Sequence, residues 1–220
     1  MYLPAHFEER RADVLHRLIA ARPFGLLVTQ GDGGIEANGV PFLLDADPAG
    51  GPGILRAHVA RANAVWRTAR TDVESLVVFQ GADSYISPAW YPSKAEHGKA
   101  VPTWNYLMVQ ARGALRVIDD AAWLRALVAR LTDHHEGARV SQGGSAPAWA
   151  IGDAPADFLD SMLKAIIGIE IVLGSLAGKW KVSQNRSAAD RDGTAEGLGE
   201  CPGDDAAEMA REVRAPGSSR

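Results

Sequence analysis

The chain has very little cysteine: Cys201 is the only one among its 220 residues. A single cysteine excludes an internal disulfide and any metal cluster built from several thiolates. No apolar run approaches the roughly 18 residues that a membrane-spanning helix needs. The first ten residues, MYLPAHFEER, lack the basic and then apolar pattern of a signal peptide. We therefore expect no membrane partner and a cytoplasmic location.

The chain also lacks an excess of positive charge. Its 23 Lys and Arg and 27 Asp and Glu give a formal net charge of −4. This charge provides no general attraction to nucleic acid, so any DNA contact would need a local basic patch. A hydrophobic content of 46% is ordinary for a globular protein, and the length fits one domain, or one domain with a tail.

Several motifs of common enzymes and metal sites are absent. No Gly-Lys-Ser/Thr of a P-loop and no G-x-S-x-G elbow occurs. The glycines at 31–34 precede a strand-like segment and not a helix, which favours a hairpin turn over a dinucleotide-binding loop. His134 and His135 are adjacent, so on a helix they point about 100° apart and cannot ligate one ion as an i, i+4 pair can. We expect no metal site.

Hydrophobic patterning predicts many strands joined by short turns, with a few helices. We expect helices over 8–22, 61–70, 121–131 and 157–164, and strands over 24–30, 35–45, 53–59, 74–80, 104–118 and 166–173. A Gly/Ser-rich loop is expected over 134–147. Because the strands do not alternate with full-length helices, the pattern favours a small β-barrel, mainly β with peripheral helices.

The composition changes after residue 186. Residues 187–220 are rich in Gly, Ala, Asp and Glu and contain few large apolar side chains. Such a segment buries too little surface to offset its ordering entropy. We therefore predict a domain over 1–186 and a disordered tail over 187–220.

The segment 79–106 has an unusual composition. Its 28 residues contain six of the fifteen aromatic side chains, together with hydroxyl, amide and ammonium groups. Flat apolar faces beside donors and cations suit a planar, anionic, heteroaromatic ligand such as flavin mononucleotide, FMN. The alternative is an aromatic-rich loop that packs over one end of a barrel.

Two further segments carry polar groups suited to such a ligand. In HVARAN, residues 58–63, Arg61 follows a strand and precedes a short helix, where it could bind a phosphate. Arg61 could equally be a surface residue and Asn63 a helix cap. In KWKVSQNR, residues 179–186, amide side chains could recognise the pyrimidine edge of a flavin.

Five ordered motifs resemble the PaiB-like family of FMN-binding negative transcriptional regulators: MYxPxxF at 1–7, HVARAN at 58–63, YISPxWY at 85–91, VPTWNY at 101–106 and KWKxSQN at 179–185. The resemblance covers about residues 1–186. It implies an FMN-binding split β-barrel, related to the pyridoxamine-phosphate-oxidase-like flavoproteins, in which two protomers pair and FMN lies between them.

Residues that match these motifs become candidate FMN contacts through the resemblance. Arg61 and Lys94 are expected near the phosphate, and Trp104 and Tyr91 near the ring. The full set is His58, Arg61, Asn63, Ser87, Tyr91, Lys94, Thr103, Trp104, Asn105 and Gln184. The chain departs from the family where Asn63 is followed by Ala64 and not by proline, and where Gly39 stands in place of an expected histidine.

The sequence leaves three functional classes open. The resemblance implies a transcriptional regulator, for which the best DNA-facing candidate is the first helix with Arg10, Arg11, Arg17 and Arg22. The alternative is an FMN-dependent oxidoreductase that reduces or oxidises a small molecule with NAD(P)H, with His97 or Tyr106 as acid or base. A third reading is a flavin-binding interaction module without turnover. Whether the chain is an enzyme is not decided by its sequence.

Overall fold

The computed structural model describes residues 1–217, and its chain contacts divide them into two compact units. Unit 1 contains Met1–Arg22, Val78–Ala111 and the residues from Leu176 onward. Unit 2 contains Pro23–Val77 and Arg112–Ser175. Three long strands, β6 (Ser75–Ile86), β7 (Thr103–Ile118) and β8 (Ile166–Lys181), contribute one segment to each unit.

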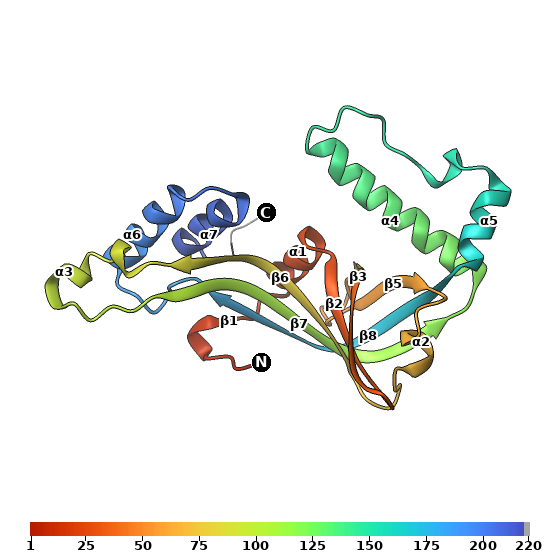
Figure 1. The fold of residues 1–220 in the computed structure, drawn as a ribbon, viewed down its shortest axis with the longest axis horizontal. Helices are drawn as coiled ribbons and strands as arrows, with labels where there is room; N and C mark the ends of the chain where they lie inside the picture. The colour runs from red at the N-terminus through yellow and green to blue at the C-terminus, as the bar shows by residue number, and fades with distance from the viewer. Residues whose placement is uncertain (218–220) are drawn as a thin grey trace. The chain divides into compact units, whose positions relative to one another are not determined.

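The strands form one sheet with the order β3-β2-β6-β7-β8-β5-β4, and β1 pairs with β8 (Figure 1). The pairings β1–β8, β2–β3, β4–β5 and β5–β8 are antiparallel. The sheet order has two ends and is not closed. The prediction of a mainly β fold with peripheral helices is confirmed.

Unit 2 holds the predicted hairpin of β2 (Phe24–Gly31) and β3 (Gly34–Pro41), whose turn has Gly34 at φ 108°. This positive φ explains the glycine, and the turn excludes a dinucleotide-binding loop. The strand predicted over 35–45 is interrupted, because β4 (Leu43–Asp45) pairs with β5 (Ile54–Ala60).

The helices of unit 2 are α2 (Val65–Thr68), α4 (Ala121–Ser141) and α5 (Ala156–Lys164), with a short 3-10 turn, η3 (Ile151–Asp153). The carboxylate of Asp120 accepts a hydrogen bond of 2.6 Å from the backbone N of Trp123, as the predicted cap requires. The loop predicted from His134 was wrong in its first half, since α4 continues to Ser141. A Glu136–Arg139 ion pair, three residues apart, supports this last part of the helix.

Unit 1 contains η1 (Ala5–Phe7), β1 (Glu8–Glu9), α1 (Ala12–Ala21), η2 (Pro88–Trp90) and α3 (Ser93–His97), besides α6 (Ala188–Gly199) and α7 (Asp204–Arg214). Helix α1 buries the predicted stripe of Val14, Leu15, Leu18 and Ile19. It begins later than predicted, because Glu8 and Glu9 pair with Lys179 and Gly178 of β8.

The predicted disordered tail differs from the structure over residues 187–217. Helices α6 and α7 lie side by side there (Figure 1) and bury Leu198, Met209 and Val213. Small residues occupy most other buried positions of the pair, so a low content of large apolar side chains was compatible with close packing. Residues 218–220 lie outside the described residues, and the domain boundary at residue 186 stays a prediction.

The first of these helices binds the aromatic segment directly. A Cβ atom added at Gly197 would lie 2.4 Å from the Trp90 ring, and one at Gly193 would lie 2.2 Å from the Trp90 carbonyl oxygen. The buried Asp190 accepts hydrogen bonds of 3.1 and 2.8 Å from the backbone N and the hydroxyl of Ser93. Helix α6 therefore fixes the position of residues 90–93.

None of the helices in residues 1–217 combines the length and the apolar character that crossing a membrane requires.

Gly197→Ala should destabilise the protein by about 1–3 kcal/mol, because the new methyl group must displace Trp90. Gly199→Ala is the matched control: it lies two residues further along α6, where a Cβ meets no atom within 4 Å. Because alanine has a higher helix propensity than glycine, Gly199→Ala should leave stability unchanged or raise it by up to about 1 kcal/mol. Urea denaturation of both variants checks this, and equal stability would show that α6 is not docked on Trp90.

Candidate functional site

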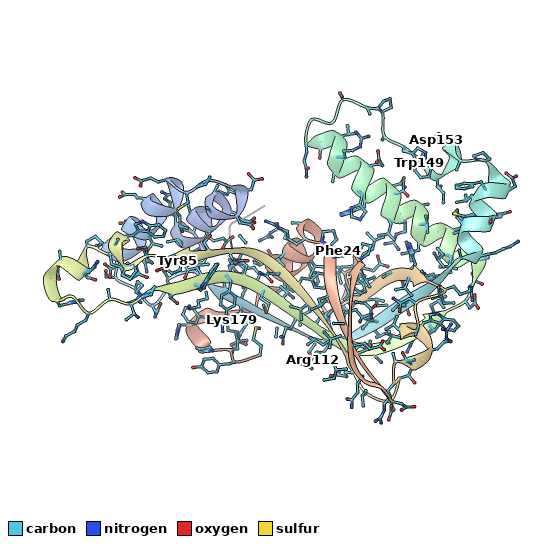
Figure 2. All side chains as sticks on the ribbon, in the orientation of Figure 1. Phe24, Tyr85, Arg112, Trp149, Asp153 and Lys179 are labelled. Atoms are coloured by element: carbon cyan, nitrogen blue, oxygen red, sulfur yellow. The ribbon has the colours of Figure 1, made fainter. Side chains whose placement is uncertain are left out.

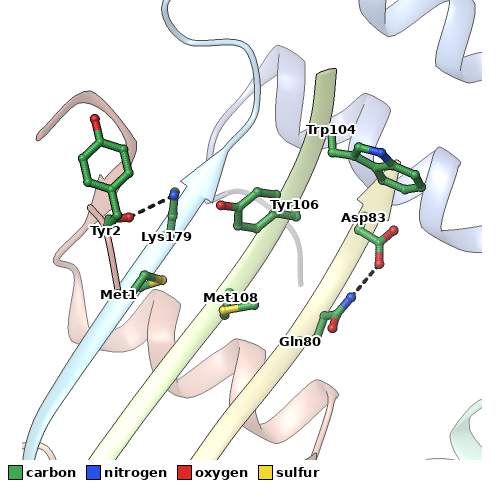
Figure 3. Close-up of a pocket in the computed structure, with 8 residues that line it drawn as sticks. All are labelled: Met1, Tyr2, Gln80, Asp83, Trp104, Tyr106, Met108 and Lys179. Carbon is green, nitrogen blue, oxygen red and sulfur yellow. Dashed lines mark hydrogen bonds between the residues drawn. The ribbon is translucent and has the colours of Figure 1, made fainter. Parts of the chain in front are cut away.

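Unit 1 contains a hollow of about 530 Å³ over one face of three neighbouring strands (Figure 3). Along β7 the side chains of Trp104, Tyr106 and Met108 line it, while the intervening Asn105 and Leu107 are buried. This alternation is the period of two that a strand imposes. The other lining residues are Met1, Tyr2, Gln80, Asp83 and Lys179.

Lys179 is the most informative group in this hollow, because its side chain is cationic and only 6% of the residue is exposed. Its Nζ donates a hydrogen bond of 3.0 Å to the Tyr2 carbonyl oxygen. The same Nζ lies 5.5 Å from the centre of the Tyr2 ring and 5.2 Å from that of Tyr106. These contacts offset part of the cost of burying the charge.

A second cation lies beside the first. The Nζ of Lys181 donates to the Thr103 hydroxyl and to the Trp104 carbonyl oxygen, and it lies 6.0 Å from the Tyr106 ring centre. Burial lowers the pKa of Lys181 below its ordinary 10.5, and the charges of Lys179 and Arg186 lower it further. Within residues 1–217, neither lysine has a carboxylate at ion-pair distance.

The opposite wall of the hollow is polar. Gln80 and Asp83 both lie on β6, and the amide of Gln80 donates a hydrogen bond of 2.7 Å to the Asp83 carboxylate (Figure 3). The hollow thus combines aromatic faces, an amide, a carboxylate and a buried ammonium group. Its volume lies in the range of small-molecule sites, roughly 300–1,000 Å³. This donor set fits a planar ligand with a negative charge, as FMN is.

Of the predicted residues, Trp104 lines this hollow and is 54% exposed. The Thr103 hydroxyl accepts a hydrogen bond from Lys181, the cation next to the hollow. Asn105, by contrast, is buried and donates a hydrogen bond of 3.0 Å to the Ser183 hydroxyl.

Four other predicted residues belong to unit 1, and three of them have local roles. The Gln184 amide accepts from the Val182 backbone N and donates to the Trp180 carbonyl oxygen, so its polar groups stabilise the turn after β8. Ser87 caps η2, and Lys94 is exposed on α3. Tyr91 is buried under the Arg186 guanidinium, 4.8 Å from its ring centre, and burial raises the pKa of its phenol.

The remaining three candidates belong to unit 2. Arg61 donates to both carboxylate oxygens of Asp119, at 2.9 and 2.6 Å. The Asn63 side chain accepts from the Val65 backbone N, as the predicted cap does, and donates to Asn38. His58 lies on β5. Asn63 thus makes the helix-capping contact. A phosphate contact from Arg61 stays a prediction.

The departure at Gly39 has a local cause. A Cβ added there would lie 2.6 Å from the Phe24 ring, which covers the glycine on the neighbouring strand. Any larger residue at position 39 would require Phe24 to move.

Sequence reasoning did not assign Tyr2, Gln80, Asp83, Met108 and Lys179 to the site. Tyr2 and Lys179 belong to two of the motifs that carry the family resemblance. The sequence therefore contained a signal for both residues, but it did not indicate a contact with the ligand. Strand alternation from Trp104 would have identified Met108, on the same face as Tyr106.

His134 and His135 lie on α4, with ring centres 5.1 Å apart. Among the residues described, no group of three or more His, Cys, Asp or Glu is arranged to hold a metal ion.

Acid should destabilise the protein through His58. Burial lowers the pKa of His58 below its ordinary 6.5, and its Nδ1 is buried without a hydrogen-bond partner. As the pH falls below 6.5, the unfolded chain takes up this proton before the folded one, so stability falls until the lowered pKa is reached. His58→Gln should reduce this loss between pH 7 and 5, as measured by urea denaturation. His97→Gln on the exposed face of α3 is the control, and identical pH profiles for parent and His58→Gln would contradict the assignment.

The chain is similar to known proteins over most of its length. Residues 1–175 match the family described as "Putative FMN-binding domain". The chain is 33% identical to the uncharacterized protein AN0679 of Emericella nidulans over 229 residues, covering 90% of each chain. It is 29% identical to the protease synthase and sporulation protein PAI 2 of Bacillus subtilis, covering 86% of this chain and 85% of the relative.

Among solved structures, the FAD and heme binding protein of Mycobacterium smegmatis superposes with a TM-score of 0.52 at 16% identity, covering 79% of this chain and 73% of that one. The likeness confirms the split-barrel type of fold. With a family match over residues 1–175, the chain belongs to the family of FMN-binding domains, and FMN is the cofactor that this membership assigns to it.

Proposed function

We propose that the protein is an FMN-binding protein of the PaiB-like regulator type that holds FMN at a homodimer interface, with its ring in the unit 1 hollow. The observation that carries the proposal is the buried ammonium of Lys179 between two tyrosine rings, in a hollow of suitable volume. A cation in this position has no carboxylate partner among residues 1–217, and an anionic ligand would supply one.

In this proposal the aromatic side chains of Trp104 and Tyr106 orient the flavin ring by stacking or edge contact. Lys179 and Lys181 face its negatively charged groups, and the Gln80 amide is available for a polar edge. When FMN is bound, it supplies electron or hydride transfer at its ring. The motif residues His58, Arg61, Asn63, Ser87, Tyr91, Lys94, Thr103, Asn105 and Gln184 stay proposed contacts through family resemblance.

A regulatory role is supported by the relationship to the Bacillus sporulation protein PAI 2. Direct DNA contact by the first helix has less support, because its arginines are engaged within the chain. Arg17 pairs with Asp13, and Arg22 pairs with Asp205 and Glu208. We therefore propose that regulation acts through a partner or through the flavin redox state, in a cytoplasmic setting.

An oxidoreductase is the second candidate. The observation that favours it is the pair of cations beside the hollow, since positive charge near a flavin stabilises its reduced, anionic form. Anaerobic mixing of the FMN-loaded protein with NADH or NADPH separates the classes. Bleaching of the flavin absorption that recovers with an added acceptor supports turnover, while unchanged absorption supports a binding module.

The homodimer is proposed from the resemblance and is supported by exposed apolar side chains. On the β2–β3 hairpin, Phe24 is 70% exposed, Leu26 46% and Ile35 77%. Strand β3 also ends the sheet order, and an end strand can pair with a second copy.

Lys179→Met should reduce FMN affinity about 10–100-fold, because a charge-assisted contact of roughly 1.5–3 kcal/mol is lost while the apolar volume is kept. The measurement is flavin absorption near about 375 and 450 nm after FMN addition and desalting. Lys99→Met, an exposed substitution, is the control and should retain flavin as the parent does. Arg61→Ala tests the other phosphate candidate in the same assay. Full retention by Lys179→Met would remove this lysine from the site.

Light scattering after size exclusion should give about twice the 23.4 kDa of one chain. Leu26→Lys should shift the mass toward one chain, because a charge would be buried in the apolar contact. Gln30→Lys is the matched control on the same strand, where an exposed polar residue already stands. A monomeric parent protein, with or without FMN, would contradict the interface.

A further inference from the structure

Unit 1 has a second, larger hollow of about 840 Å³, where the end of β6 meets the turn between α6 and α7. Half of its lining comes from the helical pair that follows residue 187, beyond the family match at residues 1–175. Figure 2 labels Tyr85 at this end of β6. The lining residues are Arg22, Asp83, Ser84, Tyr85, Ser87, Trp90, Trp104, Leu198, Cys201, Pro202, Gly203, Asp204, Asp205 and Ala206.

Two aromatic rings are open on this side. Tyr85 is 49% exposed and Trp104 is 54% exposed, and their ring centres lie 6.2 Å apart at an interplanar angle of 75°. A third ring, that of Trp90, is held against Gly197 of α6. Rings held at a steep angle to one another offer both a face and an edge to a flat ligand.

The lining of this hollow is more acidic than that of the FMN hollow, where Lys179 and Asp83 are the charged residues. It contains three carboxylates, Asp83, Asp204 and Asp205, and one cation, Arg22. Arg22 is already neutralised, since it donates to Asp205 at 2.6 Å and to Glu208 at 3.0 Å. In the described part of the chain, Asp204 has no cation at ion-pair distance.

From these contacts we infer that the second hollow binds a small planar aromatic cation. The volume and the open rings of Tyr85 and Trp104 indicate a flat ligand, and the surplus of carboxylates determines its sign of charge. A dinucleotide such as NAD(P)H is disfavoured there, because its phosphates would face Asp204 and Asp205, which the FMN hollow lacks.

The two hollows share Trp104 and Asp83 as lining residues. A ligand in the second hollow is therefore placed beside the FMN hollow, as a sensed compound or a reaction partner of the flavin would be. The role of this ligand beside the flavin rests on the proposed function. Binding of the cation in the second hollow does not depend on it.

The test is calorimetric titration of the FMN-free protein with 1-methylquinolinium, a planar cation, and with quinoline-2-carboxylate, an anion of similar shape. We expect the cation to bind at least about tenfold more tightly. Asp204→Asn should weaken the cation by about two- to fivefold, as expected for a partly exposed charge pair. Asp192→Asn, on the exposed side of α6, is the control and should change nothing. Equal binding of both probes, absence of binding, or an unaffected Asp204→Asn variant would overturn the inference.

Two further variants separate this site from the FMN hollow. Tyr85→Ala should weaken 1-methylquinolinium and retain FMN, while Lys179→Met should lose FMN and retain 1-methylquinolinium. Loss of cation binding in FMN-saturated protein would place both ligands in one hollow and overturn the inference. Binding of the cation by a protein that never retains FMN would leave the second site standing and contradict the proposed function.

Discussion

The buried ammonium group of Lys179 is the constraint on which the chemistry of unit 1 depends. Burial of a cation costs several kcal/mol unless polar or charged groups compensate it. One carbonyl oxygen and two tyrosine faces supply part of that compensation. Lys181 adds a second cation close by, which increases this cost. Burial lowers the pKa of Lys181, and the charges of Lys179 and Arg186 lower it further. An anionic ligand stabilises both, so the site is suited to a ligand that brings negative charge and a flat ring together.

Much of the fold could be predicted from the hydrophobic pattern of the strands. Alternation along residues 104–118 predicted β7 almost to the residue, and the same alternation places Trp104 and Tyr106 on one face. The aromatic segment includes Trp104 and Tyr106, which line the unit 1 hollow. What the pattern could not supply was the partner of each polar group. Asn105 and Gln184 had suitable chemistry for a flavin, yet their hydrogen bonds are made within the chain.

The tail shows a different limit of sequence reasoning. Its composition suggested disorder, because large apolar residues are few after residue 186. The helix is held by close contacts and not by large apolar side chains. Gly193 and Gly197 allow α6 to approach Trp90, and Asp190 accepts hydrogen bonds from Ser93. Glycine usually weakens a helix, so its benefit is visible only when the neighbouring ring is known. These contacts bring the helical pair to the second hollow, whose lining is more acidic than that of the first.

The measurement that tests the central claim most directly is a crystal structure of the protein with FMN bound. The account predicts the flavin ring against Trp104 and Tyr106, with the Lys179 ammonium within hydrogen-bonding distance, about 2.7–3.2 Å, of a ligand oxygen or nitrogen. A flavin ring bound only away from the unit 1 hollow, with Lys179 in contact with protein atoms alone, would contradict it.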